Sequence, residues 1–200
     1  MKEAIVHLKR ADPDISGIID RVGDYRIEFR EPNYETLVKS IVYQQLSGRV
    51  ASVIFGRLAR AAGGAITPEA VLKLRPARMR SLGLSERKTE YIRDLARHAR
   101  SGEVVFEELL TLGDDAIIER LTQVRGIGEW TVHMFLMFAL RRLDVLPVGD
   151  LGIRAAIRKA YAMPELPTPA DVEDLGARWK PYRTVASWYL WRSLEPNANL

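Results

Sequence analysis

Apolar residues recur along most of this chain at intervals of three and four positions, the spacing that gathers them on one face of a helix. In residues 34–46 they fall at Leu37, Val38, Ile41, Val42 and Leu46. Comparable segments run over residues 48–62, 85–102, 117–123, 130–140, 151–162 and 182–194. The pattern therefore predicts an all-α fold.

The turns between these segments carry their own signals. Ser47 is expected to cap the helix that follows it, and Gly63-Gly64 to end that helix. The one strand-like stretch, residues 25–29, is too short to found a sheet. Three dipeptides place a capping side chain before a proline in the first helical position: Asp12-Pro13, Thr67-Pro68 and Thr168-Pro169.

Composition suits a globular protein. With 200 residues, 47% of them hydrophobic, the chain can bury its own core as one domain or as two small helical lobes that share a cleft. No run approaches the roughly 18 apolar residues of a membrane span, and the charged N-terminus lacks signal-peptide character. The absence of cysteine excludes disulfides, thiol nucleophiles and iron–sulfur clusters. We therefore expect a soluble intracellular protein.

Positive charge is concentrated in one segment. The whole chain has a net charge of +4, from 30 basic and 26 acidic residues. Residues 73–100 hold nine Lys and Arg against three Asp and Glu, an excess of +6, which leaves about −2 for the remainder. Such a segment suits a polyanionic partner, although a solvated helix face explains the charge equally well.

A Gly-x-Gly turn joins two of the predicted helices. Gly126-Ile127-Gly128 lies between the helix over 117–123 and the helix that begins near Trp130. Glycines let the backbone turn tightly and approach a ligand closely, and the amides that open the second helix suit a phosphate. Val124 and Ile127 are placed to anchor the turn in the core. These features predict a helix-hairpin-helix that grips the DNA backbone without reading its sequence.

Asp150 is the leading candidate for a reactive group. Read alone, it is an N-cap for the helix that begins at Leu151. It also lies 22 residues after Gly128, enough for one helix outward and a loop back, so its carboxylate can return to the mouth of the hairpin. The two roles are compatible because a helix N-terminus favours an ionised carboxylate.

The hairpin, Asp150 and the upstream segment Ile41-Val42-Tyr43-Gln44-Gln45-Leu46-Ser47 together resemble the helix-hairpin-helix DNA glycosylase superfamily. Within it the chain is most similar to the DNA-3-methyladenine glycosylase II branch, from about Asn33 to Glu195. The resemblance implies a single domain over 1–200, a two-lobed helical bundle with a central cleft, with lobes at roughly 34–145 and at 1–33 plus 146–200. It also implies a monomer in the cytoplasm, with the nucleoid, of a prokaryote or in the nucleus of a eukaryote.

The resemblance assigns four roles to residues of this chain. Asp150 matches the catalytic carboxylate. Gln45 best matches the residue that fills the gap left by an extruded nucleotide. The pocket for the extruded base falls on Trp130, Met134, Leu151 and Trp191, and the DNA contacts on Gln44, Gln45, Ser47, Arg125, Gly126, Gly128 and Thr131.

Some of these residues have an alternative role, and the chain differs from some members of the superfamily. Trp130 and Trp191 could instead be core residues, the usual fate of tryptophan in a helical protein and the one expected for Trp179 and Trp188. His133 is expected at the surface or against a phosphate. Bifunctional relatives carry a Schiff-base lysine where this chain has Trp130, which implies an enzyme without strand cleavage.

The chain also departs from the family pattern in the base pocket, and the resemblance bears on which cofactors are expected. Met134 and Leu151 stand where one branch carries tyrosines, so the pocket is expected to be less aromatic. Neither a metal site nor a cofactor is expected, apart from a monovalent cation at the hairpin when DNA is bound.

The implied reaction is hydrolysis of the N-glycosidic bond of an alkylated purine, of the 3-methyladenine or 7-methylguanine type, in double-stranded DNA. The nucleotide must first rotate out of the helix, and a carboxylate then stabilises the oxocarbenium-like sugar. Two alternatives stay open. A non-catalytic helix-hairpin-helix module would not need Asp150, and a uracil or mismatch glycosylase of the same fold would prefer neutral bases.

Overall fold

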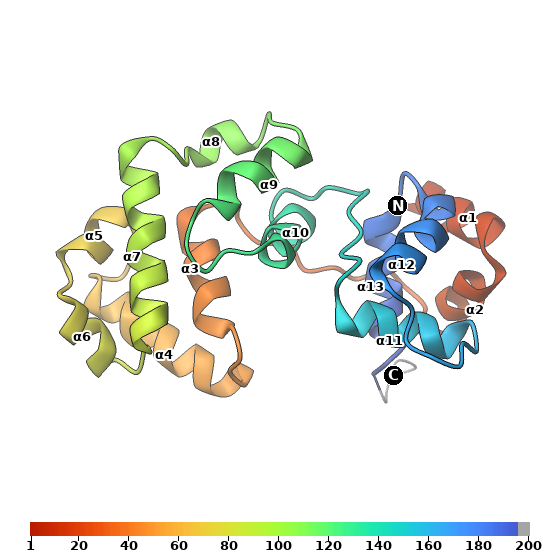
Figure 1. The fold of residues 1–200 in the computed structure, drawn as a ribbon, viewed down its shortest axis with the longest axis horizontal. Helices are drawn as coiled ribbons and strands as arrows, with labels where there is room; N and C mark the ends of the chain where they lie inside the picture. Colours follow the sequence, from red (N-terminus) through yellow and green to blue (C-terminus); the bar gives the residue numbers. More distant parts are fainter. Residues whose placement is uncertain (196–200) are drawn as a thin grey trace. The chain divides into compact units, whose positions relative to one another are not determined.

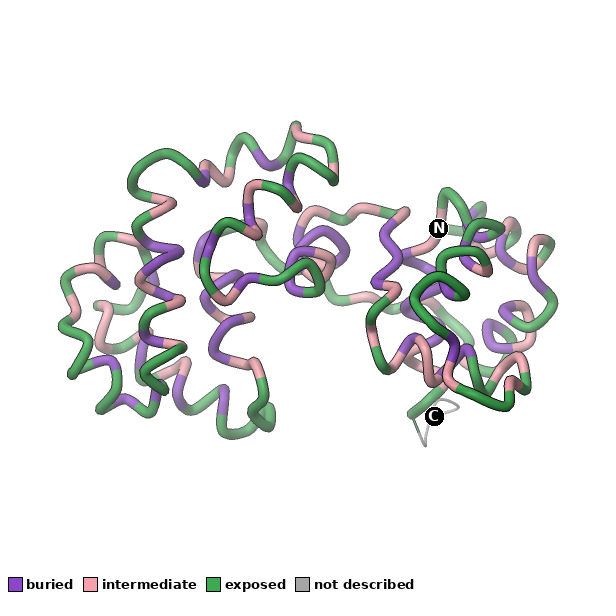
Figure 2. Tube along the Cα trace, viewed as in Figure 1, coloured by how far each residue is buried: buried purple, intermediate pink, exposed green. Residues whose placement is uncertain are grey.

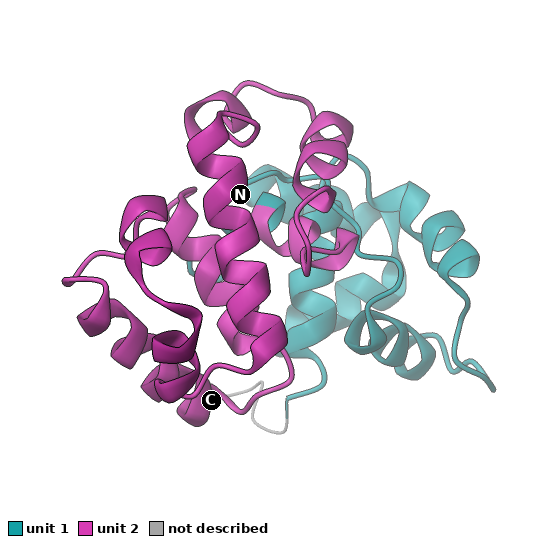
Figure 3. Cartoon of the chain, turned by 60° about the vertical axis from the view of Figure 1, so that its left-hand side comes forward, with its two compact units in different colours: residues 1–29, 136–200 teal, residues 30–135 magenta. Residues whose placement is uncertain are grey.

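The computed structural model describes residues 1–195, and all the regular elements in that range are helices (Figure 1). The all-α prediction is confirmed, and residues 25–29 form neither a helix nor a strand. The chain divides into two compact units (Figure 3). Unit 1 comprises Met1–Phe29 and the chain from Leu136 onward, and unit 2 comprises Arg30–Phe135.

Unit 2 is organised around one long helix, α7 (Glu86–Ser101), which packs against α3, α5 and α6. Buried residues recur along α7, among them Ile92 and Leu95, and exposed residues lie between them (Figure 2). The remaining helices of the unit are α3 (Tyr34–Tyr43), α4 (Gly48–Ala61), α5 (Pro68–Lys73), α6 (Pro76–Ser81), α8 (Phe106–Leu109), α9 (Asp114–Thr122) and α10 (Glu129–Phe138), whose C-terminal end belongs to unit 1.

Unit 1 surrounds α13 (Arg183–Arg192), whose residues 184–190 are all buried. A helix that is buried on every side needs neighbours all round, and α13 packs against α1, α2 and α11. The other helices are α1 (Lys2–Ala11), α2 (Pro13–Val22), α11 (Leu151–Ala160), α12 (Pro169–Gly176) and the 3₁₀ helix η1 (Ala177–Trp179).

Asp12 links the N-terminal helices of unit 1 to its C-terminal part through hydrogen bonds. The carboxylate is 0% exposed, and its Oδ1 accepts from the amides of Asp14, at 3.0 Å, and Ile15, at 3.2 Å, as the predicted cap of α2. Its Oδ2 accepts from the hydroxyl of Tyr161, at 2.5 Å, and from Nε1 of Trp179, at 2.9 Å. A buried carboxylate is tolerated because it is this fully hydrogen-bonded. Trp179 is thus a core residue, as expected.

The capping predictions hold at most positions. The side chains of Thr67 and Thr168 each accept a hydrogen bond from an amide in the first turn of the helix that follows. The side chain of Ser85 caps α7 in the same way. Ser47 precedes α4 as predicted, but its side chain makes no capping hydrogen bond. The sequence analysis missed α1, where the apolar residues Ala4, Ile5 and Leu8 do have helical spacing but stand among charged residues.

Helix α3 ends at Tyr43, earlier than the apolar spacing predicts. Gln44 leaves the helical region, with φ −54° and ψ 127°, and Gln45 has a positive φ of 55°. Periodicity alone cannot locate this break because Leu46 continues the apolar spacing beyond it.

Candidate functional site

Asp150 lies at the N-terminus of α11 and its carboxylate is held by two donors. Oδ1 accepts from the amide of Ile153, at 2.8 Å, which confirms the predicted N-cap. The same oxygen accepts from Nε1 of Trp191, on α13, at 2.8 Å. Charge-assisted hydrogen bonds of this kind are the stronger class, so the carboxylate has a fixed orientation.

Gly152 makes the contact between Trp191 and Asp150 possible. A Cβ at this position would lie 3.0 Å from Cδ1 of Trp191 and 3.1 Å from Oδ1 of Asp150. Both distances are tighter than ordinary van der Waals contact. The absence of a side chain at Gly152 therefore lets the indole lie against the first turn of α11.

Trp191 is partly exposed and is supported from one side. The ring of Phe138 stacks on it with a centroid separation of 6.1 Å and an interplanar angle of 24°. Leu151, next to Asp150 in the chain, is 67% exposed. Unit 1 thus brings together a fixed carboxylate, an indole and an exposed apolar side chain, all of them residues to which the sequence assigned a role.

The two glycines of the hairpin turn have different environments. Gly126 has φ +82°, and a Cβ there would fall 2.1 Å from Cδ2 of Tyr91, on α7. No such constraint acts at Gly128, where a Cβ would meet nothing within 4 Å. Val124 and Ile127 are buried, as predicted for the residues that anchor the turn. Gly126 is needed by the fold, whereas Gly128 leaves an open approach to the backbone.

Helix α7 also holds the hairpin through Asp94. Its Oδ2 accepts from the amide of Arg125 at 3.0 Å, and its Oδ1 accepts from the guanidinium of Arg97 at 2.8 Å. Burial by itself raises the pKa of Asp94, but these hydrogen bonds and the neighbouring cations lower it below its ordinary value. The Arg125 side chain is exposed and pairs with Glu90.

The predicted site residues on α10 have mixed exposure. Trp130 is 51% exposed, so the alternative in which it fills the core does not apply. Met134 is partly buried. Thr131 is only 5% exposed and has little side-chain surface to offer a ligand. His133, expected at the surface or against a phosphate, is partly buried, with Nε2 3.6 Å from Oε1 of Glu129.

The loop between α3 and α4 lies beside the hairpin turn. Gln45 and Ser47 are exposed, whereas Gln44 is partly buried and donates from Nε2 to the carbonyl of Gly126 at 2.9 Å. Unit 2 therefore brings together the loop and the hairpin, two segments far apart in the sequence. Sequence reasoning missed Lys88, whose Nζ donates to the carbonyl of Gln44 at 2.6 Å, because only the fold places α7 beside this loop.

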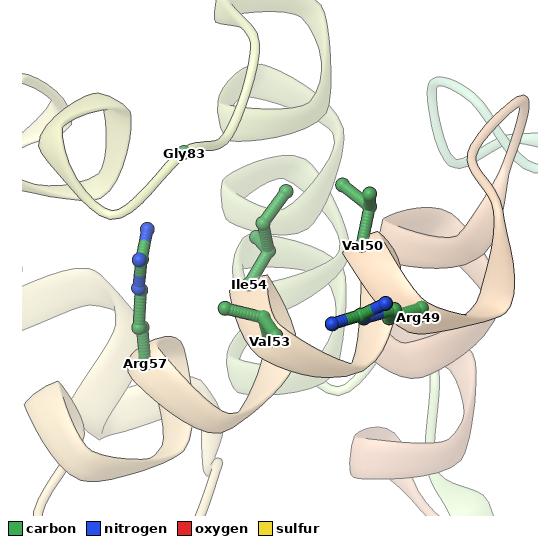
Figure 4. Close-up of a pocket in the computed structure, with 6 residues that line it drawn as sticks. All are labelled: Arg49, Val50, Val53, Ile54, Arg57 and Gly83. Carbon is green, nitrogen blue, oxygen red and sulfur yellow. The ribbon is translucent and has the colours of Figure 1, made fainter.

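A surface groove of about 350 Å³ lies elsewhere on unit 2 (Figure 4). It follows α4 and the turn before α7, with an apolar floor between two arginines, and it contains none of the predicted site residues. Its lining residues are Arg49, Val50, Val53, Ile54, Arg57 and Gly83. Among the described residues there is no cluster of three or more His, Asp or Glu suited to a metal ion. The helices over the same residues are all too short or too polar to cross a membrane.

Comparison with known proteins agrees with the fold and with the motifs. The sequence model of the HhH-GPD superfamily of base excision DNA repair proteins matches residues 38–181. DNA-3-methyladenine glycosylase 1 of Schizosaccharomyces pombe is 37% identical over 96% of this chain and 87% of its own length.

Two solved structures are similar to nearly the whole chain. A DNA-3-methyladenine glycosidase from Bacillus halodurans superposes with a TM-score of 0.87 and 38% identity, over 94% of this chain and 88% of its own. The 3-methyladenine DNA glycosylase of Schizosaccharomyces pombe, solved in complex with abasic DNA, gives a TM-score of 0.84 and 38% identity over 95% of each chain.

Proposed function

This chain belongs to the HhH-GPD superfamily of base excision DNA repair proteins, and we propose that it is a monofunctional DNA glycosylase that excises alkylated purines. The observation that carries the proposal is the carboxylate of Asp150, fixed at a helix N-terminus by an indole that is itself partly exposed. The similar proteins are named for 3-methyladenine. We extend the proposed substrates of this chain to purines alkylated at N3 or N7.

The carboxylate serves the cleavage step. As the N-glycosidic bond breaks, positive charge develops on the sugar, and a preorganised carboxylate beside it stabilises that charge. Asp150 also orients the attacking water and accepts its proton. Alkylation at N3 or N7 makes the purine cationic and a good leaving group, so little general-acid assistance is required. One carboxylate is then sufficient for the chemistry.

The aromatic residues serve recognition. An indole face attracts a cationic base more strongly than a neutral one, by roughly 0.5–2 kcal/mol. Trp191 offers such a face and also holds Asp150. For Trp130 and Met134 we retain the base-contact role implied by the sequence. Since position 130 is a tryptophan and not a lysine, we expect no Schiff base and no strand cleavage.

The hairpin and the loop before α4 serve DNA binding. The open backbone at Gly128 is suited to a close phosphate contact. Gln45, exposed beside the hairpin, is suited to fill the gap left by the extruded nucleotide. We infer that the partner is double-stranded DNA carrying alkylated bases and that the protein acts as a monomer.

The deciding experiment is release of bases from methylated DNA, resolved by chromatography. The wild type should release 3-methyladenine and 7-methylguanine. Asp150→Asn should fold, bind DNA that contains an abasic site, and lose nearly all release, because the amide cannot stabilise the cationic sugar. Near-wild-type release by Asp150→Asn would refute the mechanism, and preferential release of uracil or mismatched bases would refute the substrate class.

Borohydride provides a second readout on the same samples. We expect no covalent enzyme–DNA adduct, and strands that stay intact until they are heated in alkali. A trapped adduct would show that an amine of this chain acts as the nucleophile.

A further inference from the structure

Lys88, in the first turn of α7, reaches back to the end of α3. Its Nζ donates to the carbonyl of Val42 at 2.7 Å and to the carbonyl of Gln44 at 2.6 Å. Lys88 is partly buried, and burial lowers the pKa of its ammonium group. A desolvated ammonium is unfavourable unless its N–H groups find acceptors. These carbonyls offset that cost, and they are also the acceptors that a helix leaves without partners at its C-terminus.

The second of these bonds acts on the conformation of Gln45. Gln45 has φ 55°, a left-handed conformation that costs roughly 1–2 kcal/mol for a residue other than glycine. Such a conformation persists only where the surroundings fix it. The carbonyl of Gln44 belongs to the peptide unit immediately before Gln45. A hydrogen bond from Lys88 to that carbonyl therefore restrains the rotation that sets φ of Gln45.

Helix α7 aligns this loop with the hairpin. Gln44 donates from its side chain to the carbonyl of Gly126, so the loop is held by α7 on one side and by the hairpin turn on the other. The hairpin in turn rests on the same helix, through Asp94 and the amide of Arg125 and through Tyr91 under Gly126. One helix thus fixes both of the segments to which we assign DNA contacts.

We propose that Lys88 is a positioning residue that presents Gln45 to the gap left by the extruded nucleotide. The inference rests on the proposed glycosylase function and deepens it. Lys88 acts through the backbone of the loop and contacts neither the base nor the sugar. Without its hydrogen bonds, Gln45 can relax to a negative φ and withdraw from the gap. Extrusion of a paired base then becomes less favourable, while cleavage of a base that is already unpaired is unaffected.

The test compares one alkylated base in two contexts, paired in duplex DNA and placed in a short unpaired bubble with the same duplex flanks. Single-turnover excision is measured at saturating enzyme for the wild type, Lys88→Met and Lys88→Arg. Lys159→Met, at an exposed lysine on α11, removes the same charge without touching the loop. We expect Lys88→Met to be about tenfold slower on the paired base, from the loss of two hydrogen bonds, and unchanged on the bubble. Lys88→Arg should recover most of the rate, and Lys159→Met should equal the wild type on both DNAs.

A double-mutant cycle ties the effect to Gln45. Gln45→Ala should show the same defect on the paired base, and adding Lys88→Met to it should cause little further loss. Additive losses, an equal loss on both DNAs, or an unchanged rate on the paired base would each overturn the inference. If the wild type releases no alkylated base from either DNA, the proposed function itself fails, so the two failures are distinguishable.

Discussion

Gly152 decides how closely Trp191 can lie against the carboxylate of Asp150. Gly152 is the second residue of α11, in the first turn of the helix. A methyl group here would push on the indole and on the carboxylate oxygen together. The contact between Trp191 and Asp150 therefore depends on the absence of a side chain at this residue.

Gly152→Ala is expected to lower base release at least tenfold while changing the thermal unfolding midpoint only slightly, because the partly exposed indole can move aside. Gly17→Ala, in α2 of the same unit, is the matched control, because a Cβ there meets only the end of the Arg21 side chain, at 3.7 Å. That control should raise stability without changing activity. The two measurements are single-turnover excision and thermal unfolding. Equal activity in the two variants would show that the contact with Trp191 is dispensable.

Trp191 combines two functions that substitutions can separate. Trp191→Phe keeps an aromatic face but loses the Nε1 donor to Asp150, and Trp191→Ala loses both. We expect the phenylalanine variant to retain more activity than the alanine variant. The alanine variant should lose more on 3-methyladenine or 7-methylguanine than on neutral hypoxanthine, since truncation removes the cation–π attraction. Single-turnover excision of matched cationic and neutral lesions would measure this. Equal losses on both lesion types would mean that Trp191 holds the carboxylate but does not read charge.

At the scale of elements, the hairpin separates a glycine that the fold requires from one that it does not. Gly126 combines a positive φ with the close approach of Tyr91, whereas Gly128 has neither constraint. The sequence showed two glycines in a turn and could not distinguish them, because the ring of Tyr91 comes from a helix that lies outside the motif.

Gly126→Ala is expected to destabilise the protein by about 2–3 kcal/mol, through backbone strain and displacement of the Tyr91 ring. Gly128→Asp should fold normally, because its side chain enters open space. It should nevertheless bind every DNA sequence more weakly and with a shallower salt dependence, as phosphate contacts are lost. Urea unfolding and salt titrations of DNA binding measure the two effects. A Gly128→Asp protein that bound DNA normally and changed only its lesion preference would not use the hairpin as a backbone grip.

On the scale of the whole molecule, buried phenols link stability to alkaline pH. Burial raises the pKa of Tyr25 and of Tyr189 from 10.0 to about 12, with smaller contributions from their neighbours. Burial also raises the pKa of Tyr34, and that of Tyr161, which additionally donates a hydrogen bond to Asp12. The native state keeps these protons at a pH where the unfolded chain has released them. For Tyr25 and Tyr189 this contribution to stability is complete below pH 10 and is lost as the pH rises through about 12.

Urea unfolding between pH 8 and pH 12 should show this dependence directly. The free energy of unfolding should fall above pH 10, by about 1.4 kcal/mol per pH unit for each such tyrosine. Tyr189 donates to the carbonyl of Gly23 at 2.9 Å, so Tyr189→Phe should be about 1 kcal/mol less stable than the wild type at pH 8. That difference should shrink as the pH approaches 12. A constant difference across the range would show that Tyr189 does not titrate with unfolding.

The sequence by itself determined the helical class, most helix starts and the local role of Asp150. Each of these follows from contacts between residues close in the chain, such as the bond from the amide of Ile153 to Asp150. Three separated motifs in the expected order also identified the superfamily. Local signals misled where a helix was broken against its apolar spacing, as at Gln44.

Only the tertiary structure decided how these residues are held. Trp191 meets Asp150 across 41 residues, Lys88 meets Gln44 across 44, and Gln44 meets Gly126 across 82. No periodic pattern encodes such pairs, because each depends on which helices pack together and at what rotation. The site residues could be identified from the sequence, but the residues that they contact could not. Each contact depends on how the whole unit packs and not on the neighbouring residues in the chain.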